Sequence, residues 1–360
     1  MVAAIFLIAI ILGDVLLLFL WYFNFKKHSP TVKTKPFVSV LIAVRNEEAN
    51  IANCLLSILK TSYPQDKYEI IVGNDGSTDK THDIVSAISI QNNNVHLVDI
   101  TECIIKKPGK ANVLAQLAQK ARGDVYMFTD ADIEVSPNWI SAMQERMDDE
   151  TGLITGVSVV EGHGFLSKMQ TIEWLLATSM IKVTSDMGIA SSSLGNNMAI
   201  SKEAYWKVGG FEKIPFSVTE DFEIFRQISK YYPTKFIFNK TVLNKSRPID
   251  GMMSLLIQRK RWMHGAFRLP LFMVTLLIMQ TAFLPILTIS MFQLLFLASA
   301  LGLFRLVAHL WFLKIAANKI SYKVSLLYLL AFPLYSGVFS ILTLIYYFLP
   351  IKIVWKGRKY

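Results

Sequence analysis

Two long apolar segments lie towards opposite ends of this 360-residue chain and limit what it can fold into. Residues 2–25 and 270–350 are almost free of acidic side chains, whereas the stretch between them reads like a soluble α/β protein. A helix needs roughly 20 apolar residues to cross a bilayer. Residues 1–25 are therefore predicted to be a transmembrane anchor, since they lack the basic start and the cleavage site of a signal peptide. Residues 271–350 are predicted to hold two to three transmembrane helices.

The C-terminal apolar segment is too long for a single crossing. We expect Leu271–Ile315 to split into two helices that turn near Ser290. Residues 324–350 form another candidate span, which Pro333 and Gly337 interrupt.

Basic residues gather beside these segments. They are Lys26, Lys27, Lys33 and Lys35 after the first segment, and Arg259, Lys260, Arg261 and Arg268 before the second. The positive-inside rule gives this placement when the polar middle of the chain is cytosolic. The net charge of +10 is therefore attributed to membrane orientation, and no nucleic-acid partner is expected because no recognition motif accompanies it. We expect an integral protein of the plasma (inner) membrane with a cytosolic catalytic part.

The side of the basic tail, residues 351–360, stays open at this point. Four full crossings would put the tail outside the cell, against the charge rule, whereas a re-entrant last segment would keep it inside.

Only two cysteines occur, Cys54 and Cys103. Two scattered cysteines give neither a disulfide framework nor a metal-ligand spacing. This suits a cytosolic location, and we expect both to be inert residues of the core.

Short apolar runs alternate with helical patterns along the polar middle. The predicted strands are Phe37–Val44, Tyr68–Val72, Val95–Val98 and Asp124–Phe128, and the predicted helices are Glu47–Lys60, Thr78–Ile90, Lys110–Ala121 and Phe222–Tyr231. Such alternation favours a mainly parallel sheet with helices on both faces. The fold class is therefore α/β, with transmembrane helices at both ends.

Polar clusters follow three of these strands. They are Arg45-Asn46-Glu47, Asn74-Asp75-Gly76 and Asp130-Ala131-Asp132. In open α/β sheets, ligands bind beyond the carboxyl ends of the strands. The three clusters are therefore expected to form one site.

The residue types in these clusters suit a phosphorylated ligand. Asp130 and Asp132 are alternate residues at a strand end and can direct two carboxylates at one Mg²⁺ or Mn²⁺ held jointly with a diphosphate. Lys110 opens a helix, where a cation and free N–H groups can hold phosphate. Taken alone, each also fits a blander interpretation, a solvated turn for the two aspartates and a surface lysine for Lys110.

Two further segments carry candidate functional residues. Glu220 and Asp221 begin a helix, where one of them can act as a general base on a hydroxyl group or both can simply favour the helix dipole. Gln258, Arg261 and Trp262 share a helix face in an amphipathic segment, residues 246–270, just before the membrane. Arg and Trp are also common in an ordinary interfacial belt.

Taken in order, these residues resemble the family 2 glycosyltransferases, which have a GT-A fold. The similarity runs from about Phe37 to Trp262, and places a GT-A nucleotide-sugar-binding domain at residues 36–245. The matching motifs are Val-Arg-Asn-Glu at 44–47, Asn-Asp-Gly-Ser-Thr-Asp at 74–79, Gly-Lys-Ala-Asn at 109–112, Asp-Ala-Asp at 130–132, Gly-Asn-Asn at 195–197, Thr-Glu-Asp at 219–221 and Gln-Arg-Lys-Arg-Trp at 258–262.

The resemblance implies a role for each matched residue. It implies that Asp221 is the catalytic base, together with Glu220, and that Asp132 and Asp130 bind a metal ion. The residues implied to contact a nucleotide-sugar donor, a UDP- or GDP-sugar, are Arg45, Glu47, Asp75, Lys110, Asp130 and Arg261. Those implied to bind the acceptor are Gln258, Trp262, Asn196 and Asn197. The implied reaction is a single displacement that inverts the anomeric carbon. The acceptor would be a membrane lipid, a lipid-linked molecule or a glycan.

Other functions remain open at this point. The Q-x-x-R-W element occurs in processive polysaccharide synthases, but also in non-processive members that glucosylate ceramide, whose arrangement of spans is like this one. An inactive nucleotide-binding subunit is a further alternative, which the joint presence of Asp132, Asp221 and Arg261 argues against.

Two charged residues lie within the predicted spans. Asp14 is in the middle of the first and Arg305 is inside the third, at similar depth. Charges within a bilayer are costly and usually face a partner. We expect the two side chains to pair, with His309 as a second partner for Asp14, although a protonated Asp14 and an Arg305 that extends to the interface would also be allowed.

Overall fold

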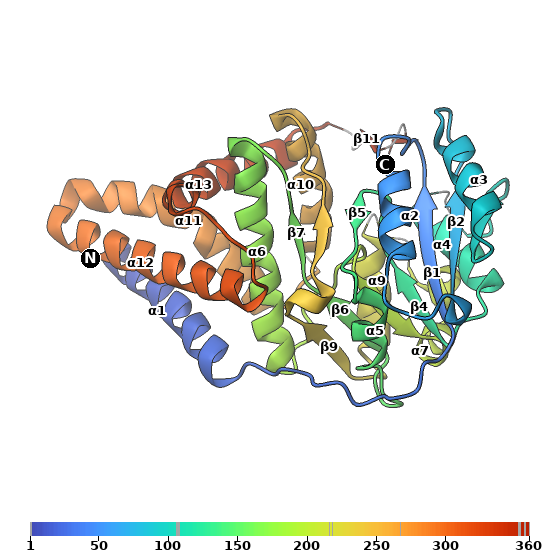
Figure 1. The fold of residues 1–360 in the computed structure, drawn as a ribbon. Helices are drawn as coiled ribbons and strands as arrows, with labels where there is room; N and C mark the ends of the chain where they lie inside the picture. Colours follow the sequence, from blue (N-terminus) through green and yellow to red (C-terminus); the bar gives the residue numbers. More distant parts are fainter. Residues whose placement is uncertain are drawn as a thin grey trace.

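The computed structural model describes residues 2–105, 109–215, 217, 219–266, 268–351, 354–355 and 358–359. An α/β part occupies one side of the molecule, and long helices extend away from it on the other side (Figure 1). Half of the predicted basic tail, residues 352–353, 356–357 and 360, lies outside the described residues.

The main sheet has seven strands. Their order is β3 (Val95–Asp99), β2 (Tyr68–Asn74), β1 (Val38–Val44), β4 (Val125–Phe128), β8 (Met198–Ser201), β6 (Leu153–Gly156) and β9 (Thr234–Ile237). The first four strands are parallel, and β8 runs antiparallel to both of its neighbours. The predicted mainly parallel sheet is confirmed.

A smaller sheet of three strands stands beside the main one. Its strands are β5 (Ile133–Glu134), β10 (Asn244–Ser246) and β7 (Ser158–Val160), and a separate pair is formed by β11 (Val354–Trp355) and β12 (Arg358–Lys359). Strand β5 continues from the Asp-Ala-Asp segment, so this sheet lies next to the candidate site.

Helices cover both faces of the main sheet. They are α2 (Ile51–Leu59), α3 (Thr81–Gln91), α4 (Lys110–Lys120), α5 (Trp139–Gln144), α6 (Phe165–Asp186), α7 (Lys202–Lys207), α8 (Gly210–Lys213) and α9 (Glu220–Ile228), with α10 (Met252–Ala266) following and 3-10 turns at Gln65–Lys67 and Lys240–Val242. Alternate strand residues divide between the two faces: Val40 and Ile42 pack with α2, α3 and α6, and Leu41 packs with α4.

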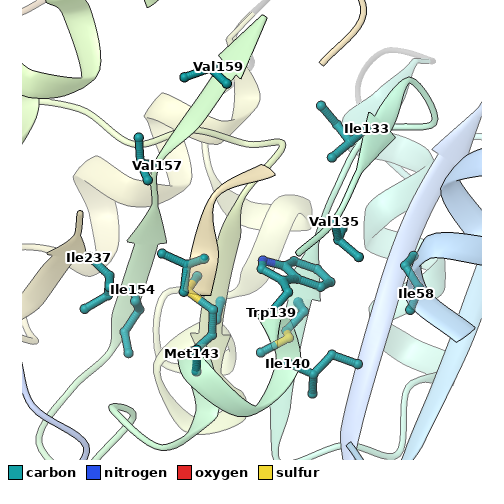
Figure 2. Close-up of a cluster of buried hydrophobic side chains, with 14 of the residues drawn as sticks. Ile58, Ile133, Val135, Trp139, Ile140, Met143, Ile154, Val157, Val159 and Ile237 are labelled. Atoms are coloured by element: carbon teal, nitrogen blue, oxygen red, sulfur yellow. The ribbon is translucent and has the colours of Figure 1, made fainter. Parts of the chain in front are cut away.

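The core on the face of the sheet that packs with α2, α3 and α6 is large. Trp139 is fully buried within it, surrounded by aliphatic side chains from the strands and from α5 (Figure 2). Cys54 lies in this core as predicted, but the prediction for Cys103 is wrong, because Cys103 is exposed.

The helix predicted from Glu47 begins later, at Ile51. Asn46 adopts a left-handed backbone with a φ of 53°, which helices do not continue through. Glu47 therefore belongs to a turn, where its backbone N–H donates to Thr81 Oγ1 at 2.7 Å.

Among the described residues, four helices are long and apolar enough to cross a membrane. They are α1 (Val2–Phe23), α11 (Leu271–Gln293), α12 (Leu295–Lys319) and α13 (Leu326–Phe348). The chain breaks between α11 and α12 at Leu294, close to the predicted turn. The expected interruption of the last segment is not found, since α13 continues through Pro333.

Helix α13 contacts the α/β part near both of its ends. Tyr328, in its first turn, lies 6.4 Å from the ring of Phe165 on α6. At the other end, Lys260 Nζ of α10 donates to the backbone carbonyl of Leu349 at 2.7 Å. Helix α11 and the N-terminal half of α12 extend away from the α/β part (Figure 1), whereas the C-terminal half of α12 packs against α6. Helix α13 is thus attached to the α/β part near both ends.

The expected pair within the apolar helices is present. Arg305 Nε donates to Asp14 Oδ2 at 2.8 Å, and His309 Nε2 lies 3.2 Å from Asp14 Oδ1. Gln280 of α11 completes the cluster, because it donates to Asp14 at 3.1 Å and accepts from Arg305. These contacts join α1 to α11 and α12.

A double-mutant cycle tests this pairing. Asp14→Asn and Arg305→Gln should each lower thermal stability in detergent, because each leaves a buried partner without its counter-charge. The double variant should cost less than the sum, with a coupling of roughly 0.5–3 kcal/mol. Lys314→Gln is the control, since Lys314 is exposed on the same helix and should add independently to Asp14→Asn. Strictly additive costs for Asp14 and Arg305 would contradict the pairing.

Candidate active site

The loops after β1 and β2 are joined by polar contacts. Arg45 Nη1 donates to the carbonyl of Asp75 at 2.6 Å, and the backbone N–H of Thr78 donates to Asn46 Oδ1 at 2.8 Å. Because β1 pairs with both β2 and β4 in parallel, the three polar clusters lie at one edge of the sheet, as predicted.

Lys110 connects this edge to α9. Its Nζ lies 2.5 Å from Asp130 Oδ1 and 3.2 Å from Glu220 Oε1, while 32% of its side chain remains exposed. Burial alone would lower the pKa of Lys110, but the negative charges of Asp130 and Glu220 outweigh burial and raise it. Lys110 therefore stays a cation that a ligand can reach.

Glu220 is the most buried member of this group, with 14% of its side chain exposed. Burial raises the pKa of Glu220, and the positive charges of Lys110 and Arg261 oppose this rise. Arg261 therefore acts on the same carboxylate as Lys110, although it comes from α10. Positive charges from two separate elements therefore act on Glu220.

Asp132, two residues after Asp130, contacts a different part of the chain. Its Oδ2 accepts a hydrogen bond from Ser246 Oγ at 3.2 Å. Burial, together with the negative charges of Asp130 and Glu47, raises the pKa of Asp132 to about 6. Crowded hard oxygen ligands of this kind are chemically suited to a divalent cation.

A cavity of about 170 Å³ opens beside Asp132. Its charged lining includes Glu134, Glu161, Lys245 and Arg247. Within the part of the chain that the structure describes, no three His, Cys, Asp or Glu side chains are grouped so that they could hold a metal ion. An ion at Asp132 would therefore need further ligands from water or a bound substrate.

Asp221 is held rigidly at the start of α9. Its Oδ2 accepts from the backbone N–H of Gly195 at 2.9 Å, and its Oδ1 accepts from the N–H of Phe222 at 2.8 Å. A side chain on Gly195 would place Cβ only 2.6 Å from Asp221 Cβ. Gly195 therefore lets the loop after α6 approach the carboxylate closely.

Asn197 does not occupy the acceptor-binding position that the resemblance implies. It has no exposed surface, and its amide accepts from Trp139 Nε1 at 2.9 Å and donates to the carbonyls of Val157 and Val242, each at 2.8 Å. Asn196 is 7% exposed and accepts from Ser158. Both side chains support the loop that carries Gly195.

Helix α10 also differs from a simple interfacial helix. Arg259 and Lys260 are buried, instead of facing outward as an amphipathic segment predicts. Gln258 accepts a hydrogen bond from Arg259, and Trp262 packs edge-on against Trp174 with ring centroids 5.6 Å apart.

Three positions near the candidate site were missed by sequence reasoning. They are Gly195, Ser246 and Glu173. Gly195 belongs to the Gly-Asn-Asn motif at 195–197, so a close approach of another side chain could have been predicted from its small size. Ser246 and Glu173 lie far along the chain from their partners, and no local pattern marks them.

The sheet topology and the strand-end site define a GT-A glycosyltransferase. The mannosyltransferase PcManGT from Pyrobaculum calidifontis, solved in complex with GDP-Man and Mn²⁺, has a similar fold, with a TM-score of 0.59 at 19% identity. The similarity covers 96% of this chain and 97% of that chain.

The chain belongs to glycosyl transferase family 21, whose profile matches residues 1–360. This membership fits the resemblance to family 2 enzymes, because the relatives are themselves named as glycosyltransferases or synthases. Membership of this family places the chain among the glycosyltransferases.

Curated relatives from bacteria share part of the chain. It is 24% identical over 237 residues to a beta-monoglucosyldiacylglycerol synthase of Nostoc sp., covering 65% of this chain and 49% of that protein. It is 30% identical over 190 residues to the poly-beta-1,6-N-acetyl-D-glucosamine synthase of Staphylococcus aureus, covering 50% of this chain and 44% of that protein. The chain thus spans about half the length of these relatives.

Gly195→Ala tests the close approach to Asp221. The added methyl group should displace the carboxylate and lower turnover by about tenfold or more, because small misplacements of catalytic groups cost up to roughly 10²-fold. Steady-state kinetics with thermal melting would measure this. Gly13→Ala on α1, where the nearest atom would lie 3.9 Å from the new Cβ, should leave turnover unchanged. Wild-type turnover in Gly195→Ala would show that the fit at Asp221 does not matter.

Proposed function

We propose that this protein is an inverting glycosyltransferase that moves a sugar from a nucleotide-diphosphate sugar to a lipid or lipid-linked acceptor at the cytosolic face of the membrane. The observation that carries the proposal is the group formed by Lys110, Asp130, Glu220 and Arg261 at the strand ends, with Asp221 fixed beside it. This group combines cations for a diphosphate with a carboxylate for a hydroxyl group.

The donor would lie across the strand ends. Arg45, Glu47 and Asp75 stand where β1 and β2 leave the sheet, which suits contact with the nucleoside. Lys110 and Arg261 would offset the negative charge that develops on the leaving diphosphate. The similar fold of PcManGT, solved with GDP-Man, supports a nucleotide sugar, and both UDP- and GDP-sugars fit this proposal.

Asp132, with Asp130, would hold Mg²⁺ or Mn²⁺ together with the diphosphate. Such an ion supplies Lewis-acid stabilisation of the leaving group. The oxygen-only set of Asp130, Asp132 and Ser246 suits it, and PcManGT was solved with Mn²⁺.

Asp221 would take the proton of the acceptor hydroxyl group. The acceptor oxygen then bonds to the anomeric carbon from the side opposite the diphosphate. The bond from that carbon to the diphosphate oxygen breaks, and the electron pair leaves with the nucleoside diphosphate. Glu220 would act through its contact with Lys110.

A lipid acceptor is supported by the four membrane-capable helices and by the relative named as a glucosyldiacylglycerol synthase. Gln258 and Trp262 on α10 would contact the acceptor beside the membrane. The basic residues next to the apolar segments support a cytosolic site, and the membrane would be the plasma (inner) membrane. The Staphylococcus aureus relative named as a polysaccharide synthase supports a second candidate, a processive synthase.

Two carboxylate variants separate catalysis from donor binding. Asp221→Asn should lower turnover by roughly 10²-fold or more, because it removes a general base, while nucleotide affinity stays near wild type. Asp132→Ala should instead lose the part of nucleotide affinity that depends on Mn²⁺. Calorimetry with and without Mn²⁺ and a transfer assay would measure both. A tenth of wild-type turnover retained by Asp221→Asn would make the base assignment wrong.

The size of the product decides between the two candidate functions. Few membrane-capable helices leave little room for a polymer channel, so one sugar or very few should be added to each acceptor. Donors would be screened with detergent-purified protein, and the lipid fraction would be analysed by mass spectrometry. A long homopolymer made by the monomer would instead establish the processive alternative.

A further inference from the structure

Arg259 and Lys260, the two residues between Gln258 and Arg261, are each only 6% exposed. A buried charge is costly unless it is paired or hydrogen-bonded. Neither residue matches a motif position to which a role was assigned above. Their burial on a helix that precedes the membrane therefore calls for a physical reason.

Arg259 links α10 to α6. Its Nε and Nη2 donate to the two carboxylate oxygens of Glu173, at 2.8 and 2.7 Å. Such a bidentate pair fixes the plane of the guanidinium group as well as its position. The side chain of Glu173 is 28% exposed, so one partner of the pair remains in contact with solvent.

The guanidinium group of Arg259 also contacts two residues of the motif, Gln258 and Trp262. It donates to Gln258 Oε1, and its Cζ lies 4.2 Å from the centre of the Trp262 ring. Trp174, which follows Glu173 on α6, packs against the Trp262 ring at an interplanar angle of 68°. Glu173 thus holds Gln258 and Trp262 through Arg259, and Trp174 contacts Trp262 directly.

Lys260 links α10 to α13. Its Nζ donates to the carbonyls of Leu349 and Tyr346, at 2.7 and 3.3 Å. The last carbonyls of a helix have no partner within the helix, and a cation there is favoured by the dipole. The C-terminal end of a membrane-capable helix is therefore attached directly to α10.

The far end of α10 approaches the base. A Cβ on Gly265 would lie 3.1 Å from Thr219 Oγ1, and Thr219 directly precedes Glu220 and Asp221 at the start of α9. Helix α10 is thus held by α6 and α13 along one part and packs against the start of α9 at its end.

We propose that Arg259 and Lys260 are positioning residues that fix α10 between α6 and α13, and so fix Arg261 and Trp262 relative to Asp221. They touch no substrate and act through their neighbours. The inference rests on the proposed function in that it takes Arg261 and Trp262 to contact donor and acceptor. Under it, the end of α13 is part of the support of the active site.

The test compares Lys260→Met with Lys260→Arg and with Lys235→Met. Lys235 is a matched control, because it donates to Asp148 at 2.6 Å and to the carbonyl of Arg146 at 3.0 Å, on the edge strand β9. Amide hydrogen exchange would be measured over residues 252–266 in the full-length protein in detergent, together with kcat and KM for donor and acceptor.

Lys260→Met should speed exchange in α10 by about fivefold or more, the size expected from losing one hydrogen bond. It should also lower kcat/KM by about tenfold or more. Lys260→Arg, which retains a donor and the charge, should recover most of both. Lys235→Met should lower thermal stability without changing either readout.

Glu173→Gln tests the other link without touching α10. It should produce the same two effects, because a neutral amide cannot accept both N–H groups of Arg259. Unchanged exchange in α10 in Lys260→Met and Glu173→Gln would overturn the inference, as would faster exchange with kinetics like those of Lys235→Met. A wild-type protein that transfers no sugar would overturn the proposed function alone. Amide hydrogen exchange in α10, together with nucleotide affinity, would then decide whether Arg259 and Lys260 position this helix.

Discussion

The parallel pairing of β1 with β2 and β4 is the constraint on which the candidate site depends. Val44 at the end of β1 lies opposite Asn74 at the end of β2, and Phe128 at the end of β4 lies opposite Leu41. All three strands therefore leave the sheet at one edge, where open α/β sheets bind ligands. Residues separated by 20 positions, Lys110 and Asp130, approach to 2.5 Å because of this arrangement.

Helix α6 connects the main sheet to α10 and to the chain that leaves α1. Its buried residues Ile172 and Leu175 belong to the core beneath the sheet, while Glu173 between them holds α10. At its C-terminal end Lys182 is fully buried and donates to Asp186 and to the carbonyl of Lys26, each at 2.6 Å. The chain that leaves α1 is thereby bound to the same helix as the Q-x-x-R-W segment.

Much of the fold could be predicted because its signals are local. The apolar runs of β1 to β4 and the positions of the apolar helices follow from hydrophobic pattern alone. The pair of Asp14 and Arg305 could be predicted because a charge in an apolar segment needs a partner, whereas Gln280 in the same cluster carries no charge to draw attention to it. The late start of α2 and the buried role of Asn197 depend on tertiary contacts with Thr81 and Trp139, which no pattern in the sequence displays.

The charges at the site explain how a donor would be received. Without a ligand, Lys110 lies between Asp130 and Glu220, so its ammonium group neutralises carboxylates that would otherwise repel one another. Under the proposed function, Lys110 would exchange its contact with Asp130 for one with an arriving diphosphate, and Asp130 with Asp132 would hold the divalent cation. Arg261, whose positive charge also opposes the raised pKa of Glu220, would remain near that carboxylate during the exchange. Because Asp221 is held by two backbone N–H groups instead of by Lys110, its position would not depend on that exchange.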